Sequence, residues 1–453
     1  MIELEEKNSN DALAAEDKRI EQKKTKYRWV VLLIIMTTYL IQYADRSNLA
    51  IVLPYLRQEY PISNLEAGLL MSLFFLGYVI TQLPSSLLYR RFGTRTIVPI
   101  SVVGFSIFTY LIGTTHSAFA IKWLRLGLGL AEGPTPIGIT TTINNWFPPK
   151  EKATAIGIGY VGATMIAPII IPPLCVWIMV NYGWRSVFHW FAIPGFVVSI
   201  IWYLWVRSRP EECPYCNEAE IEYIKDTESI SASNQTKLHR SLGWLGKILR
   251  VKKIRQLEKS KDVFTSKDIW LTAIGYMLIL VVNNGMITWI PSYLVTEKHY
   301  SFIKMGFMSA LPWIGGFLGS SVGGWLSDKV FVKLRKPTML ITSLMTAVLM
   351  AVLINIPENI TVIGITLFTI GFFLQLGYPG FTAYPMGIAN KATYPTAIAL
   401  VNSVGNLGGF ISPIVAGFLL DTFQVYSATF VFFGIAAILS FACVLLIDEP
   451  EEI

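Results

Sequence analysis

The chain has 453 residues, of which 53% are hydrophobic and only 15% are charged. With a mean hydropathy of +0.51, it carries far more apolar surface than one or two soluble cores could bury, which places it among membrane proteins. The formal net charge of +7 needs no nucleic-acid partner, because basic loops that face anionic lipids account for it.

Apolar segments long enough to cross a bilayer, about 20 residues each, recur twelve times along the chain. The sequence therefore predicts an all-α polytopic membrane protein with twelve transmembrane helices in two six-helix halves. The first segment is not a cleaved signal peptide, because it is too long and contains charges. The predicted spans are 28–53, 67–89, 96–113, 118–142, 154–179, 186–206, 269–295, 305–326, 337–356, 360–384, 396–420 and 428–447.

Lysine and arginine concentrate in alternate connections between these spans, which predicts on which side each connection lies. We expect both termini to face the cytoplasm, in a multi-pass protein of the inner (plasma) membrane. The basic connections contain Lys23, Lys24, Lys26, Arg90, Arg91, Arg95, Lys150, Lys152, Lys329, Lys333, Arg335, Lys336 and Lys391.

One long polar stretch, residues 207–267, divides the spans six and six. It is typical of a cytoplasmic linker between two transporter halves. The predicted organisation is a cytoplasmic tail at 1–27, an N-terminal half at 28–206, the linker at 207–267, a C-terminal half at 268–447 and a tail at 448–453. A weak internal repeat supports two halves, because Thr154-Ala155-Ile156 opens span five and Thr396-Ala397-Ile398 opens span eleven.

Charged residues inside membrane spans are costly and mark candidate functional sites. The first span contains Asp45 and Arg46 after Tyr43, and the fourth contains Arg125 and Glu132 seven residues apart on one helix face. A guanidinium can hold an anion, whereas a carboxylate can carry a proton. The alternative is that these charges only brace helix packing by pairing with one another.

Uncharged polar side chains recur at similar depth on several spans, which favours a polar cavity suited to an anionic, hydroxyl-bearing ligand. For each amide alone, an interhelical hydrogen bond is an equally good explanation. A helix break near Pro379-Gly380 would free carbonyls to line this cavity. The candidates are Gln42, Asn48, Tyr78, Gln82, Asn283, Asn284, Gln375, Tyr378, Asn402 and Asn406.

Other function classes find little support. No phosphate-binding loop is present, and Cys213 and Cys216 lack the second pair that a zinc site needs. We therefore expect no metal and no cofactor. A membrane enzyme would need a nucleophile–base or metal constellation at membrane depth, and a sensor would need an output domain larger than the linker.

Three motifs make the chain resemble the major facilitator superfamily, and within it the anion:cation symporter family of sugar-acid, hexuronate and phthalate carriers. The linker opening Arg209-Pro210-Glu211-Glu212 is also similar to this family. The motifs are Tyr43-Ala44-Asp45-Arg46-Ser47-Asn48, Arg125-Leu126-Gly127-Leu128-Gly129-Leu130-Ala131-Glu132-Gly133 with Trp146-Phe147-Pro148, and Gly323-Gly324-Trp325-Leu326-Ser327-Asp328-Lys329.

This resemblance implies a substrate cavity between the halves. It places Arg46, Tyr78 and one of Asn402 and Asn406 near the substrate carboxylate and hydroxyls. It also implies proton carriers at two further positions, Asp45 and Glu132, with Arg125 as the charge partner.

The resemblance also implies a cytoplasmic gate, in which the chain departs from the superfamily pattern. Arg91 and Gly93 are retained after span two, but Ser86 replaces the usual Gly and Arg90 the usual Asp. Asp328 keeps the acidic position in the second half. The usual gate salt bridge of the first half is therefore not expected.

The function we expect is a proton-driven symporter that imports a small organic anion, such as a sugar acid, by alternating access. Galactonate itself is a weaker expectation than the class, because Ala163 stands where galactonate carriers have Gln. The expected partners are the anion, protons and membrane lipids, and the expected state is a monomer. The alternative is a proton-coupled drug or metabolite exporter on the same fold.

Overall fold

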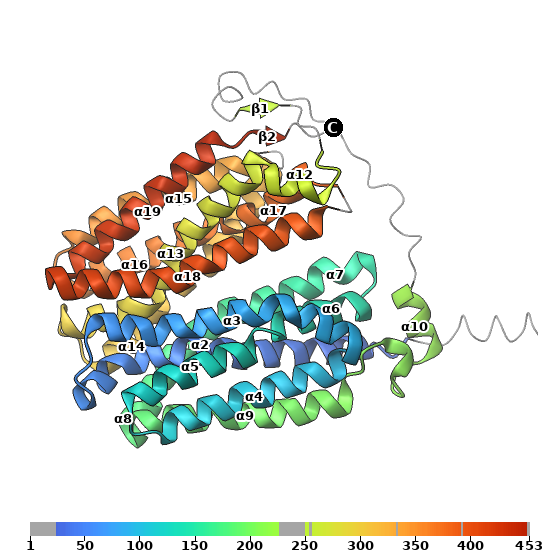
Figure 1. Ribbon diagram of the computed structural model, residues 1–453, viewed down its shortest axis with the longest axis horizontal. Coiled ribbons are helices and arrows are strands. Elements are labelled where there is room, and N and C mark those ends of the chain that lie inside the picture. The colour runs from blue at the N-terminus through green and yellow to red at the C-terminus, as the bar shows by residue number, and fades with distance from the viewer. Residues whose placement is uncertain (1–23, 226–249, 253–255, 332–333, 391–392, 451–453) are drawn as a thin grey trace, which may run out of the picture.

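The computed structural model describes residues 24–225, 250–252, 256–331, 334–390 and 393–450, which are almost entirely helical (Figure 1). Most of the predicted N-terminal tail and the middle of the linker lie outside the described residues. The N-terminal elements are α2 (Tyr27–Glu59), α3 (Asn64–Phe92), α4 (Thr94–Thr114), α5 (Ala118–Glu132), α6 (Thr135–Trp146), α7 (Pro149–Ile156), the π-helical turn η1 (Gly157–Gly162), α8 (Ala163–Tyr182) and α9 (Trp184–Trp205).

Short linker elements follow, and then the second set of long helices. The linker elements are η2 (Pro210–Glu212), α10 (Glu218–Lys225), β1 (Val251–Lys252) and α12 (Ser260–Thr265). The C-terminal elements are α13 (Lys267–Thr296), α14 (Phe302–Trp325), η4 (Leu326–Val330), α15 (Lys336–Ile354), α16 (Ile360–Leu376), α17 (Tyr378–Ile388), α18 (Tyr394–Phe423), α19 (Tyr426–Leu446) and β2 (Glu449–Pro450). Strands β1 and β2 form a short parallel pair.

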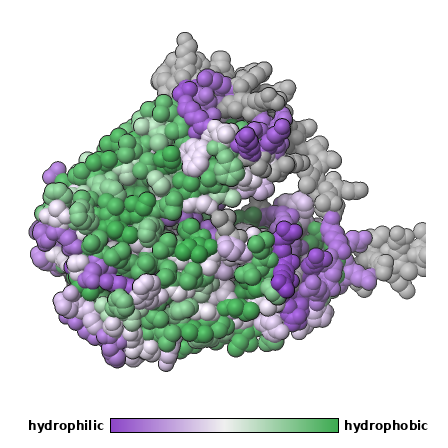
Figure 2. Space-filling view, in the orientation of Figure 1, coloured by the Kyte–Doolittle hydropathy of each residue, from purple (hydrophilic) through white to green (hydrophobic). Residues whose placement is uncertain are grey.

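The predicted fold class is confirmed. In the described part of the chain, eleven helical segments are long and apolar enough to cross a membrane, and α5 with α6 supplies the twelfth as two shorter pieces. Figure 1 shows two bundles, one ending with α9 and the other beginning with α13. Hydrophobic residues cover much of the visible surface (Figure 2), as lipid contact requires.

The span predicted over 118–142 consists of two consecutive helices, α5 and α6, which are separated by a turn at Gly133 and Pro134 where the backbone angles stay helical. Proline has no backbone N–H, so Pro134 and Pro136 cannot bond to the carbonyls of the preceding turn. One carbonyl freed in this way belongs to Glu132, and it accepts a hydrogen bond from Gln42 Nε2 at 3.4 Å. The interruption therefore lies beside a buried carboxylate.

The second bundle has a matching interruption between α16 and α17, at Gly377. Pro379 follows Gln375 by four residues, just as Pro136 follows Glu132. Interrupted helices at corresponding positions of two transporter halves are a recurrent mark of a midplane binding site.

The two bundles meet most closely at the end opposite the linker. Helix α3 packs against α18, α2 against α13 and α8 against α14. At Gly68 a Cβ atom would lie 2.2 Å from the Pro413 carbonyl oxygen, and at Gly417 it would lie 2.3 Å from that of Asn64. Only glycine allows this approach of α3 to α18.

A carboxylate of the C-terminal bundle caps a helix of the N-terminal bundle at this end. Asp421 accepts hydrogen bonds from the backbone N–H groups of Asn64 and Leu65, at 2.9 and 2.7 Å, and from Asn64 Nδ2 at 2.8 Å. These N–H groups open α3, where a negative charge is stabilised by the helix dipole. The contact holds the bundles together opposite the linker.

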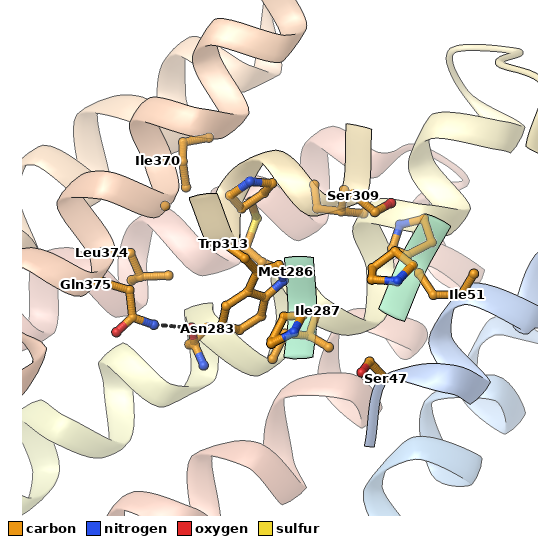
Figure 3. A pocket seen from close by; sticks show the side chains of 16 residues that line it. Ser47, Ile51, Asn283, Met286, Ile287, Ser309, Trp313, Ile370, Leu374 and Gln375 are labelled. Atoms are coloured by element: carbon orange, nitrogen blue, oxygen red, sulfur yellow. Dashed lines mark hydrogen bonds between the residues drawn. The ribbon is translucent and has the colours of Figure 1, made fainter. Parts of the chain in front are cut away.

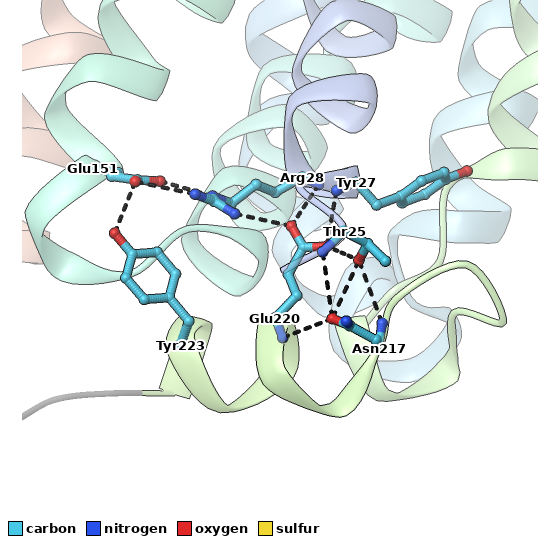
Figure 4. A network of polar contacts seen from close by, with 7 residues as sticks. All are labelled: Thr25, Tyr27, Arg28, Glu151, Asn217, Glu220 and Tyr223. Atoms are coloured by element: carbon cyan, nitrogen blue, oxygen red, sulfur yellow. Dashed lines mark hydrogen bonds and ion pairs between the residues drawn. The ribbon is translucent and has the colours of Figure 1, made fainter. Parts of the chain in front are cut away.

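At the linker end, the linker helix α10 is tied to the N-terminal bundle (Figure 4). Glu220 accepts hydrogen bonds from the backbone N–H groups of Tyr27 and Arg28 at 2.8 and 3.2 Å, and from the Arg28 guanidinium at 3.0 Å. Arg28 also pairs with Glu151 at 2.8 Å. Burial opposes ionisation of Glu220, but these bonds outweigh it and keep its pKa below the usual range. Between the bundles, Figure 2 shows the surface hollowed near the linker end.

We expect Asp421→Asn to weaken closure at the end opposite the linker, because it removes the charge at the start of α3. Such contacts are worth about 1 kcal/mol, so the ratio of closed to open molecules should fall about fivefold. Spin labels at Pro61 and Thr422 in a cysteine-free background would report the distance between the two bundles. Glu66→Gln is the matched control, because Glu66 pairs with Lys122 of its own bundle and should leave the distances unchanged. Equal distance distributions in wild type and Asp421→Asn would contradict the assignment.

Candidate functional site

Two adjoining cavities lie between the bundles, and both are lined by Ser47, Pro168, Ile287 and Trp313. We call them the arginine cavity and the apolar cavity. The arginine cavity is also lined by Tyr43, Arg46, Ala50, Met71, Phe75, Arg125, Asn284 and Thr288. The apolar cavity is also lined by Ile51, Pro172, Asn283, Met286, Ile290, Pro291, Ser309, Pro312, Ile370, Gly371, Leu374 and Gln375.

A buried ion pair joins α2 to α5 beside the arginine cavity. Arg46 Nε lies 2.7 Å from Glu132 Oε1, and Gln42 Nε2 donates to the same oxygen at 3.0 Å. Glu132 is fully buried, and in the described part of the chain its Oε2 atom has no hydrogen-bond partner. The pair therefore leaves one carboxylate oxygen with unused hydrogen-bonding capacity.

Aromatic rings surround the Arg46 guanidinium. Its central carbon lies 4.5 Å from the ring centroid of Tyr78, 5.4 Å from that of Tyr43 and 5.5 Å from that of Phe74. Such faces stabilise a cation where water is excluded. The Nη2 atom of Arg46 is buried and has no partner among the described residues, and the Arg46 side chain lines the arginine cavity.

Arg125 is the second guanidinium of the arginine cavity, and its side chain is buried. Its Nη1 atom donates to the backbone oxygen of Asp45 at 3.1 Å, and its central carbon lies 4.8 Å from the Phe74 ring centroid. No described carboxylate lies within ion-pair distance of Arg125. The charge partner of Glu132 is thus Arg46, and the expected pairing of Glu132 with Arg125 is not found.

Asp45 is fully buried but lines neither cavity. One carboxylate oxygen accepts a hydrogen bond from Asn48 Nδ2 at 3.2 Å. The other has no partner within the described residues. The two candidate proton carriers therefore occupy different surroundings, because the Glu132 carboxylate is bonded to a residue that lines a cavity, whereas Asp45 meets such a residue through its backbone oxygen.

The apolar cavity is built mainly from aliphatic side chains and prolines. Figure 3 shows Asn283 and Gln375 at one side of it, joined by a hydrogen bond of 3.2 Å from Gln375 Nε2 to Asn283 Oδ1. Ser309 lies away from this pair, with Trp313 between. The expected polar cavity is therefore polar only in parts, because most of its lining is hydrocarbon.

Several predicted binding residues lie outside the two cavities. Tyr78 touches Arg46 through its ring, and the Tyr378 hydroxyl accepts a hydrogen bond from Tyr276 at 2.8 Å. Gln82, Asn402 and Asn406 are half-buried and line neither cavity. The structure thus brings together Tyr43, Arg46, Arg125, Asn283, Asn284 and Gln375, with Glu132 and Tyr78 directly behind them.

The predicted gating residues lie at the linker end. Gly93 connects α3 to α4 with a φ of +72°, a conformation that favours glycine. The Arg91 guanidinium lies 5.2 Å from the Phe92 ring centroid. Asp328 pairs with Arg335 at 2.8 Å, which is a contact within the C-terminal bundle.

The C-terminal segment also joins the linker end. Glu449 accepts hydrogen bonds from the backbone N–H groups of Arg335 and Lys336, at 2.7 and 3.0 Å. Burial raises the pKa of Glu449 to about 7. Arg335 therefore connects the predicted gate residue Asp328 to a carboxyl group that titrates near neutral pH.

Sequence reasoning missed several cavity residues, among them Trp313, Thr288 and Ser309. Trp313 forms an edge contact with Tyr43 across the bundles, with ring centroids 6.5 Å apart. A tryptophan in the middle of a predicted span, next to Pro312, was the one available signal, because tryptophan usually lies at span ends. Among the described residues no group of three His, Cys, Asp or Glu side chains could hold a metal ion.

Comparison with known proteins shows a family and several individual proteins to which this chain is similar. The family model described as Major Facilitator Superfamily matches residues 35–413 and 333–453. The "Probable galactarate/D-glucarate transporter" of Escherichia coli (strain K12) is 30% identical over 438 residues, covering 92% of this chain and 93% of that protein. Its Bacillus subtilis (strain 168) namesake is 28% identical, covering 94% and 93%. The "Hexuronate transporter" of Bacillus subtilis (strain 168) is 26% identical, covering 94% and 96%.

Among solved structures, a bacterial homologue of the human lysosomal transporter Spinster matches with a TM-score of 0.74. It is 17% identical and covers 93% of this chain and 97% of that chain. This structural likeness supports the twelve-helix fold. The match to the family model confirms the resemblance to the major facilitator superfamily that the sequence motifs indicated.

A double-mutant cycle would test the Arg46–Glu132 pair. Arg46→Met leaves a buried carboxylate without its cation, which should lower the free energy of unfolding by about 3–5 kcal/mol. Adding Glu132→Gln should recover much of that loss, because no buried charge then remains. The partly exposed pair Lys122–Glu66 provides the control, since pairs with access to solvent contribute only about 0–1 kcal/mol. Denaturant titration in mixed micelles measures the free energy of unfolding of each variant. If Arg46→Met lowers this free energy no more than Lys122→Met does, the pairing of Arg46 with Glu132 is contradicted.

Proposed function

The chain belongs to the major facilitator superfamily, and from this premise we propose that it imports a small organic anion together with protons by alternating access. It is a multi-pass membrane transporter and not an enzyme. The single observation that carries the proposal is a pair of guanidinium groups lining one cavity between the bundles, with Arg125 lacking a carboxylate partner in the described part of the chain.

An anion is the ligand that this cavity favours. A buried cation without a counter-ion is costly, so a carboxylate entering the arginine cavity lowers the electrostatic cost of Arg125. Arg46 Nη2 offers a second donor in the same cavity. Planar guanidinium groups bind carboxylates with two parallel hydrogen bonds, which would orient the substrate with its charged end at the arginines.

Coupling to protons follows from competition for Arg46. Its guanidinium is bonded to Glu132 at 2.7 Å, and a substrate carboxylate would draw part of that interaction away. A buried carboxylate that loses its cation is stabilised by taking up a proton. Anion and proton would then load together, and each would favour the other. Asp45 remains a second candidate carrier, in a position that the substrate does not contact.

The closed end and the open end indicate which state of the transport cycle this conformation represents. Asp421 and the glycine contacts hold the bundles together opposite the linker. Basic loops lie at the linker end, which supports a cytoplasmic location for that end. In our proposal this is a state that releases substrate inside the cell, in the inner membrane, and a monomer is sufficient because each cavity is formed by one chain.

A drug exporter on the same fold is the second candidate, and the cavity disfavours it. Exported drugs are usually cationic, and two guanidinium groups would repel them. The relatives named above carry galactarate, glucarate and hexuronate by their names, all of which are carboxylates. We therefore assign an organic acid as the substrate class.

Uptake into proteoliposomes tests the proposal. Labelled hexanoate, D-gluconate and D-glucarate would be offered with and without an inward proton gradient, and we expect the gradient to drive accumulation of at least one of them. Glu132→Gln mimics the protonated state of the carboxyl group. It should therefore lower gradient-driven accumulation at least tenfold, while exchange of substrate across the membrane continues. Glu66→Gln, on the outer end of α3, serves as control. Gradient-driven accumulation by Glu132→Gln at the wild-type level would place the coupling elsewhere.

A further inference from the structure

The apolar cavity limits which organic anions can bind, because it adjoins the arginine cavity and shares Ser47, Pro168, Ile287 and Trp313 with it. A ligand whose carboxylate lies at Arg46 and Arg125 therefore extends its other end into the apolar cavity. The chemistry of that second cavity decides what the body of the ligand must be.

Hydrogen-bonding groups are scarce in the apolar cavity. Four of its sixteen lining residues carry a hydroxyl or amide side chain, namely Ser47, Asn283, Ser309 and Gln375. The Ser47 hydroxyl donates to the Tyr43 backbone oxygen at 3.0 Å. The amides of Gln375 and Asn283 are bonded to each other at 3.2 Å. Within the described residues, the polar atoms here that are buried without a partner are Gln375 Oε1 and the Ser309 hydroxyl.

Aliphatic groups make up the rest of the wall. Met286, Ile290, Ile370 and Leu374 are each less than 10% exposed in the structure and face this cavity from α13 and α16. Four prolines, from α8, α13 and α14, also line it, and a proline offers no N–H to a ligand. This wall suits a hydrocarbon body.

A sugar acid fits such a wall poorly. Each hydroxyl brought into an apolar site loses its water and must find a protein partner. A six-carbon aldonate brings five hydroxyls, whereas four of the sixteen residues that line the apolar cavity carry a hydroxyl or amide side chain, Trp313 adds an indole N–H, and the two amides are already bonded to each other. Apolar pockets disfavour a single added hydroxyl by up to about 100-fold, so several unmatched hydroxyls should weaken binding strongly.

We propose that this transporter selects amphipathic carboxylates, with one anionic end at Arg46 and Arg125 and a compact hydrocarbon body in the apolar cavity bearing at most one or two hydroxyls. The inference rests on the proposed function, since it assumes that the arginine cavity holds a carboxylate. The substrate class that we propose for this chain therefore differs from that of relatives whose names specify polyhydroxylated diacids.

A matched ligand series tests it. Hexanoate, 6-hydroxyhexanoate and D-gluconate share six carbons and one carboxylate and differ in the number of hydroxyls. With purified full-length protein in nanodiscs, dissociation constants can be read from tryptophan fluorescence, because Trp313 lines both cavities. We expect hexanoate to bind at least tenfold more tightly than D-gluconate, and 6-hydroxyhexanoate to bind within threefold of hexanoate. Hexanol has the same hydrocarbon chain but no carboxylate, so the fluorescence change that it causes measures partition into the lipid and is subtracted.

The outcomes separate the two proposals. Tighter binding of D-gluconate than of hexanoate would overturn the amphipathic class and leave an organic-anion transporter standing. Binding of none of the three, nor of D-glucarate, would overturn both. If Arg125→Gln binds hexanoate with the wild-type dissociation constant, the carboxylate does not bind in the arginine cavity. That result would also overturn both the amphipathic class and the organic-anion proposal.

A cavity-filling variant provides a second measurement. Leu374→Phe adds volume to the apolar cavity, so hexanoate affinity should fall at least fivefold while acetate, which needs only the arginine cavity, binds as in wild type. Ile365→Phe on the same helix is the control, because Ile365 is 62% exposed on the outer face. Equal hexanoate affinity in Leu374→Phe and wild type would contradict the placement of the hydrocarbon body.

Discussion

The buried ion pair between Arg46 and Glu132 is the interaction on which the rest of the site depends. Two opposite charges 2.7 Å apart inside a membrane bundle are stable together and costly apart. Any ligand that attracts Arg46 must therefore change the environment of Glu132. Because a guanidinium keeps its charge whereas a carboxylate can take up a proton, the exchange of partners at Arg46 links anion binding to proton binding without a separate coupling device.

Backbone features hold this pair in place and leave room for movement around it. Pro136 removes the helix bond to the Glu132 carbonyl, which Gln42 then contacts, and the same spacing of Gln375 and Pro379 recurs in the second bundle. The bundles touch through glycines of α3 and α18, so their contact at one end is close yet carries few large interlocking side chains. A small number of polar contacts, such as those of Asp421, can then bias the balance between closed and open states.

The sequence predicted the fold well, because span length follows from the thickness of the bilayer. It also singled out Asp45, Arg46, Arg125 and Glu132 as charges inside membrane spans, and these four side chains lie inside the N-terminal bundle. It did not predict which charges pair. The seven-residue spacing of Arg125 and Glu132 placed them on one helix face, but the partner of Glu132 comes from α2. The packing of one helix against another cannot be predicted from the periodicity within a single helix. Asn402 and Asn406 were predicted at the site and line neither cavity. On the glycine-rich α18, Gly405 and Gly408 pack on α13, and glycine gives no hydropathic signal of which face is inside. The apolar cavity was missed since its isoleucines and prolines resemble ordinary core residues.

Proton uptake on anion binding tests the central claim most directly. Purified protein in weakly buffered solution near neutral pH would be mixed with the most tightly bound carboxylate of the uptake experiments, while a pH indicator follows the proton. Competition for Arg46 predicts uptake of about one proton per anion bound, and its loss in Glu132→Gln although that variant still binds the anion. Anion binding without proton uptake, or equal uptake in wild type and Glu132→Gln, would contradict coupling through the Arg46–Glu132 pair.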